Sequence, residues 1–296
     1  MLKIVVRQLA LLVGSLLLTI NCLAATDPVQ VFVSVLPQKF FVERIAGEHA
    51  KVEVMVGSGQ SPETYEPSPK QLLKLATAKV YFSIGVPFEK VWMPHMSSVN
   101  DHLAIVDLST RATAYYNDDQ SIDEHTLEDP HIWVSPVLAK LSAEQIMETL
   151  VKIDPGNAEN YQENYHKLEK ELDDLDQKIR QSLTGHEKKS FLVMHPAWGF
   201  FAKTYDLEQI AIEHEGKSPS AKSLHKLIKR AEDEKIKVVF IQDQHSSRMA
   251  ETVASAIGAK VVKLDPLAEN YIENIRKVAT EIANSFSGST QKENNK

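Results

Sequence analysis

The chain has 296 residues, with 33 Lys or Arg against 40 Asp or Glu, so its formal net charge is −7. This acidic balance argues against nucleic acid as a partner and is compatible with cations. Cys22 is the only cysteine. Beyond that residue no disulfide or thiolate ligand can form, so any metal site there must use His, Asp and Glu.

The N-terminus is typical of a secretory signal peptide, which we expect to cover residues 1–24. Two basic residues precede the apolar run LLVGSLLLTI, and small residues follow up to Ala24. The run is too short for a transmembrane anchor, and TIN before Cys22 fits a lipid-attachment box poorly. We therefore expect cleavage after Ala24 and a mature product of 272 residues with a net charge of −9, because the leader carries two of the basic residues and no acid.

Eight short β-branched runs follow, each with a helix-like segment behind it. They cover residues 29–36, 51–56, 79–85, 103–108, 190–195, 208–213, 237–243 and 259–265. Nearly continuous apolar strands that alternate with helices predict parallel sheets covered on both faces. Four strands in each half predict an α/β fold of two lobes.

A long charged segment, residues 154–183, separates the two groups of strands. Its apolar residues recur at steps of three and four, forming one stripe: Tyr161, Tyr165, Leu168, Leu172, Leu175 and Ile179. A coiled-coil dimer would explain the stripe, but we favour one long helix lying across both lobes of the same molecule.

These patterns divide the mature chain into four parts. We expect an N-terminal α/β lobe at 25–153, a linking helix at 154–184, a C-terminal α/β lobe at 185–286 and a polar tail at 287–296. Residues 111–130, RATAYYNDDQSIDEHTLEDP, are interpreted as an acidic loop.

Four residues stand out as candidates for a site. His195 directly follows the strand SFLVM, Asp265 follows VVKL, and His131 is held between Pro130 and an apolar pair. Glu63 lies in SGQSPETYEPSP, a loop that three prolines stiffen. Taken singly, each has an ordinary explanation as a core histidine, a turn or cap aspartate, or a solvated glutamate.

Taken together, the four residues suggest a metal site. Open α/β sheets place ligand groups just beyond the carboxyl ends of their strands, and each half of the chain supplies two of the candidates. Two imidazoles and two carboxylates in a cleft between lobes can bind Zn²⁺ in tetrahedral geometry, or Mn²⁺ with a bidentate carboxylate.

At these residues the sequence resembles the ZnuA/TroA-like solute-binding proteins of zinc and manganese ABC importers. SPETYEPSPKQLLKLATAKVYFSIGVPFE is similar to the P-H-x-Y-E-P loop and the strand after it. EDPHIWVSP resembles D-P-H-x-W, MHPAWGFFAKTYDL resembles H-x-A-(F/W)-G-Y-F, and the segment ending in LDPL resembles the last ligand segment of the family. The resemblance extends over nearly all of the mature chain.

The resemblance implies two α/β lobes joined by one rigid helix, with His131, His195 and Asp265 as metal ligands. The sequence departs from the family at Glu63, where histidine is usual. A site of two histidines and two carboxylates still suits Zn²⁺ but moves the balance towards Mn²⁺.

The function implied is a periplasmic protein that captures zinc, or alternatively manganese, and delivers it to the membrane permease of an ABC importer. We expect no catalysis, no nucleic-acid partner and a monomer. Two alternatives are a secreted metal-dependent hydrolase, if three residues and a water hold the metal, and a metal-binding surface adhesin.

Overall fold

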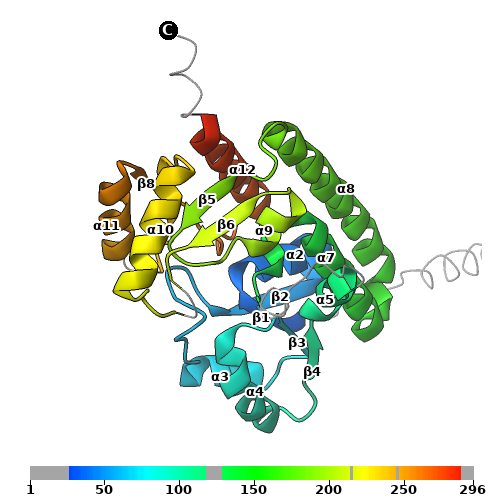
Figure 1. The fold of residues 1–296 in the computed structure, drawn as a ribbon. Coiled ribbons are helices and arrows are strands. Elements are labelled where there is room, and N and C mark those ends of the chain that lie inside the picture. The colour runs from blue at the N-terminus through cyan, green and yellow to red at the C-terminus, as the bar shows by residue number, and fades with distance from the viewer. Residues whose placement is uncertain (1–26, 118–128, 214–215, 245–246, 288–296) are drawn as a thin grey trace, which may run out of the picture.

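The computed structural model describes residues 27–117, 129–213, 216–244 and 247–287. The expected signal peptide and nearly all of the expected tail lie outside these residues. Two four-stranded parallel sheets, each surrounded by helices, make up two halves of the molecule (Figure 1). This confirms the predicted fold class.

In the first half the sheet has the strand order β2-β1-β3-β4, and every pairing is parallel. Its elements are β1 (Val29–Val35), α2 (Leu36–Ala46), β2 (Ala50–Val56), α3 (Pro69–Leu75), β3 (Val80–Ser83), α4 (Pro87–Val99), β4 (Ala104–Asp107), α5 (Ser109–Asn117), the 3₁₀ turn η3 (Ile132–Val134) and α7 (Pro136–Ile153).

In the second half the order is β6-β5-β7-β8, again all parallel. Its elements are β5 (Ser190–Val193), α9 (Gly199–Thr204), β6 (Glu208–Ala211), α10 (Ala221–Asp233), β7 (Val238–Ile241), α11 (Arg248–Ile257), β8 (Lys260–Lys263) and α12 (Tyr271–Ser287). All eight predicted strands are therefore present, within a few residues of the expected bounds.

The long helix α8 (Ala158–Leu183) runs along the side of both halves (Figure 1). Its whole apolar stripe is buried within this chain, because the helix packs on α2 and α7 of the first half and on α12 of the second. That packing confirms the long-helix interpretation and removes the need for a coiled-coil partner. The helix begins later than expected, since α7 ends at Ile153 and a short 3₁₀ turn, Pro155–Asn157, lies between the two helices.

The prediction of an acidic loop at 111–130 was wrong for its first part, because residues 111–117 belong to helix α5. Asp107 accepts hydrogen bonds from the amide and hydroxyl of Ser109 as the helix begins. Arg111 then pairs with Glu144 and Glu148 of α7 at 2.7 and 2.5 Å. Tertiary ion pairs therefore support a segment that composition alone assigns to a loop; residues 118–128 lie outside the described part.

The two halves share one continuous hydrophobic core. Phe41 of α2 packs edge-on against Tyr271 of α12, with ring centroids 4.7 Å apart. The hydroxyls of Ser135 and Thr204 lie 2.8 Å apart across the same interface. Within the described ranges, the molecule has no helix that is both long and apolar enough to cross a membrane.

Candidate metal centre

The topology of each sheet creates a natural place for a ligand. In the second half, β5 pairs with β6 on one side and β7 on the other, and ligands bind where the strand order reverses in this way. His195, Glu213 and Asp265 each lie two residues beyond the last residue of β5, β6 and β8. Parallel strands bring these three positions to the same edge of the sheet.

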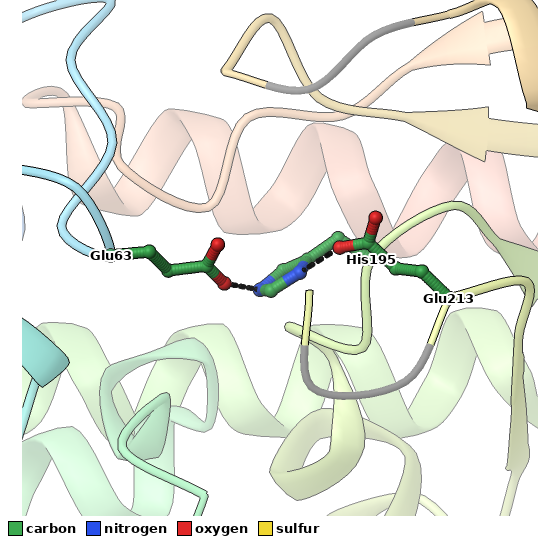
Figure 2. A group of neighbouring side chains, drawn as sticks. All are labelled: Glu63, His195 and Glu213. Carbon is green, nitrogen blue, oxygen red and sulfur yellow. Dashed lines mark hydrogen bonds and ion pairs between the residues drawn. The ribbon is translucent and has the colours of Figure 1, made fainter. Parts of the chain in front are cut away.

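His195 lies between two carboxylates that come from different halves of the molecule (Figure 2). Its Nδ1 is 2.6 Å from Oε1 of Glu213, and its Nε2 is 3.4 Å from Oε1 of Glu63. His195 and Glu213 are both 7% exposed. The backbone amide of Glu213 donates to the carbonyl of Met194, so the pairing of β5 with β6 fixes the Glu213–His195 contact.

Glu63 reaches this place from the proline-rich loop between β2 and α3. The Phe88 amide at the start of α4 donates to the Pro62 carbonyl at 3.2 Å. The ring of Tyr65 packs edge-on against Phe88 at 5.1 Å, and its hydroxyl donates to Gln71. The Glu63 side chain is 32% exposed, so the loop is anchored on both sides of a carboxylate that still reaches solvent.

His131 lies beside His195, with ring centroids 5.5 Å apart. Oδ1 of Asp129 accepts a hydrogen bond from the His131 amide and lies 2.7 Å from its Nδ1. The other oxygen of Asp129 comes so close to Gly199 that a Cβ there would lie 2.9 Å from it. A side chain at Gly199 would therefore displace the group that orients His131.

Asp265 is tied to the segment that carries His131. The indole nitrogen of Trp133 donates to the Pro266 carbonyl at 2.7 Å. Oδ1 of Asp265 accepts from the Leu267 amide at 2.9 Å and from Nε2 of Gln244 at 3.3 Å. These contacts fix the Asp265 carboxylate and the backbone that follows it.

Of the four expected ligands, the structure brings Glu63 and His195 into direct contact. Ligand-type atoms of these two and of Glu213 lie within 4.8 Å of one another, whereas His131 and Asp265 stand outside this cluster. The four-ligand set therefore stays a prediction. Sequence reasoning missed Glu213, although it ends a predicted strand just as His195 does.

The arrangement suits a divalent cation. The Nδ1 atoms of both candidate histidines lie within hydrogen-bond distance of a carboxylate, Glu213 for His195 and Asp129 for His131. Such a carboxylate selects the tautomer that presents Nε2 as the metal ligand and fixes the orientation of the ring. Carboxylates and neutral imidazoles together form a donor set that both Zn²⁺ and Mn²⁺ accept.

Comparison with known proteins agrees with this chemistry. Residues 31–285 match the family described as "Zinc-uptake complex component A periplasmic". The "High-affinity zinc uptake system protein ZnuA" of Bacillus subtilis is 31% identical over 254 residues, which cover 81% of this chain and 79% of that protein. A "Putative metal-binding protein" of Chlamydia muridarum is 31% identical over 86% of this chain and 90% of its own length.

Solved structures give the same result. A crystal structure of ZnuA superposes with a TM-score of 0.80 and 38% identity, covering 88% of this chain and 99% of the other. A ZnuA deletion mutant with zinc bound superposes with a TM-score of 0.79 and 37% identity, covering 88% and 98%. The chain belongs to the zinc-uptake complex component A (ZnuA) family of periplasmic solute-binding proteins.

Proposed function

We propose that this protein captures Zn²⁺ in the periplasm and delivers it to the permease of an ABC importer. The observation that carries the proposal is the buried imidazole of His195, held between a carboxylate of its own half and one of the other half. Relatives named as zinc-uptake proteins and a zinc-bound structural relative support zinc as the substrate.

The ligands in this proposal are Glu63, His131, His195 and Asp265. Glu213 and Asp129 would each orient a histidine through Nδ1. Four protein donors would satisfy tetrahedral Zn²⁺ and leave no open position for a water nucleophile. We therefore favour a transport protein over a metallohydrolase, in agreement with the solute-binding family. Because one chain would supply all four ligands, we propose that it acts as a monomer.

Direct binding to the mature protein tests the proposal. Metal-free protein would be titrated with Zn²⁺ and with Mn²⁺ against a chromophoric chelator. We expect one zinc ion per chain and a large loss of affinity for His195→Ala and Glu63→Ala. Glu66→Ala is the matched control for Glu63, because it removes an exposed carboxylate from the same loop.

Two results would contradict the proposal. One is wild-type protein that binds neither metal. The other is His195→Ala protein that is folded and binds zinc as tightly as the wild type. Uptake of radioactive zinc by cells that lack the protein, with and without the gene restored, then tests delivery to a permease separately from binding.

A further inference from the structure

Glu89, in the first turn of α4, is a buried carboxylate outside the proposed ligand set. It is 4% exposed. It accepts hydrogen bonds from the Ser34 hydroxyl, from the Ile84 amide at 3.0 Å and from the Gly85 amide at 2.8 Å. No Lys or Arg in the described ranges pairs with it, and burial raises its pKa to about 7. Burying an acid without a cation is costly, which singles this residue out.

The turn that Glu89 holds lies against the segment that carries His131. Gly85 has φ +88°, a left-handed conformation that favours glycine. A Cβ on Gly85 would lie 4.0 Å from Cβ of Pro130, the residue before His131. Gly85, one of the two residues whose amides donate to Glu89, therefore lies beside the residue that precedes His131.

The same turn of α4 also anchors the loop that carries Glu63. Phe88, the neighbour of Glu89, donates its amide to the Pro62 carbonyl at 3.2 Å and packs its ring on Tyr65. Pro62 and Tyr65 flank Glu63 closely. A shift of the start of α4 relative to the sheet would therefore move this loop.

We propose that Glu89 is a positioning residue for metal capture: by fixing the β3–α4 turn to the end of β1, it sets the spacing of Glu63 and His131. The proposal rests on the proposed function, because it assumes that both residues are metal ligands. Glu89 itself does not contact the metal.

The test compares Glu89→Leu with Glu89→Gln. Leucine has a similar size but accepts no hydrogen bond, whereas the glutamine oxygen can accept from the backbone amides and its nitrogen can donate to the Ser34 hydroxyl. Because groups that orient metal ligands typically change affinity 10–100-fold, we expect Leu to weaken zinc binding about tenfold and Gln less than about threefold. Circular dichroism at the assay temperature would show that each variant is folded.

Asn100→Leu is the matched control. Asn100 is also buried and lies at the other end of α4, where its side chain donates to the carbonyls of Leu75 and Ala78. Loss of these bonds should lower stability and leave zinc affinity within about threefold of the wild type. Comparison of the zinc affinities of Glu89→Leu and Asn100→Leu therefore distinguishes a positioning effect from a general loss of stability in α4.

A double-mutant cycle shows whether Glu89 acts through the ligands. The penalty of Glu89→Leu should shrink in at least one of the Glu63→Ala and His131→Ala backgrounds. An undiminished penalty in both would overturn the inference, as would wild-type affinity in folded Glu89→Leu or an equal loss in Glu89→Gln. If Glu89→Leu does not fold, Glu89→Asp, whose carboxylate is one methylene further from the two amides, must show the tenfold loss. Wild-type protein that binds no zinc would instead refute the proposed function.

Discussion

Replacement of Glu213 by Gln tests whether the Glu213–His195 contact supports zinc binding at the proposed metal centre. The change keeps an acceptor for Nδ1 of His195 but removes the charge from a contact of 2.6 Å between two side chains that are almost fully buried. A buried hydrogen bond to a charged group contributes about 1.5–3 kcal/mol. Loss of such a partner of a ligand histidine typically lowers metal affinity by about 10–100-fold.

We therefore expect Glu213→Gln to weaken zinc binding by about tenfold, because the amide holds and polarises the imidazole less strongly than the carboxylate. The assay is chelator competition at a fixed pH and salt concentration. Glu208→Gln is the matched control, since it removes the same charge from the other end of β6, where Glu208 is half exposed and pairs with Arg230. The reasoning is refuted if folded Glu213→Gln keeps wild-type affinity, or if both variants lose the same amount.

Three further predictions concern the proposed ligand Glu63, the buried acid Glu89 and the long helix α8. Glu63→His should raise the ratio of zinc to manganese affinity, because imidazole favours Zn²⁺ over Mn²⁺ relative to carboxylate; parallel titrations with both metals check this, and an unchanged ratio would count against Glu63 as a ligand. Burial raises the pKa of Glu89 to about 7, so its contribution to stability is most favourable below pH 4.5 and is lost as pH rises through 7. We therefore compare the free energy of unfolding, measured in urea, of metal-free Glu89→Gln and metal-free wild type. The variant's value minus the wild-type value should increase by roughly 2 to 3 kcal/mol as pH rises from 5 to 8. Leu172→Ala should destabilise the protein by about 2–5 kcal/mol, because Leu172 is 1% exposed within the shared core, whereas Lys170→Ala on the outer face of the same helix should have little effect.

Much of the fold could be predicted from local patterns. A β-branched run such as VVFI in β7 can be read without knowing its neighbours, since both faces of a parallel strand must be apolar. The stripe from Tyr161 to Ile179 likewise predicted a helix with one buried face. Residues 111–117 gave no such signal, and there tertiary contacts, including the ion pairs of Arg111 with α7, support the helix.

For the candidate centre, too, some features could be predicted from the sequence and others became visible only in the structure. The sequence by itself determined that His195 and Asp265 follow strands, that His131 lies between Pro130 and an apolar pair, and that a glutamate stands where the family usually has histidine. Only the tertiary structure decided that Glu63 meets His195 from the other half, that Glu213 holds its second nitrogen, and that Asp129 orients His131 beside Gly199. The physical reason is that the periodicity of apolar residues within a segment is enough to indicate a strand or a helix. Contacts between distant side chains depend instead on strand order and on how the shared core fixes one half against the other.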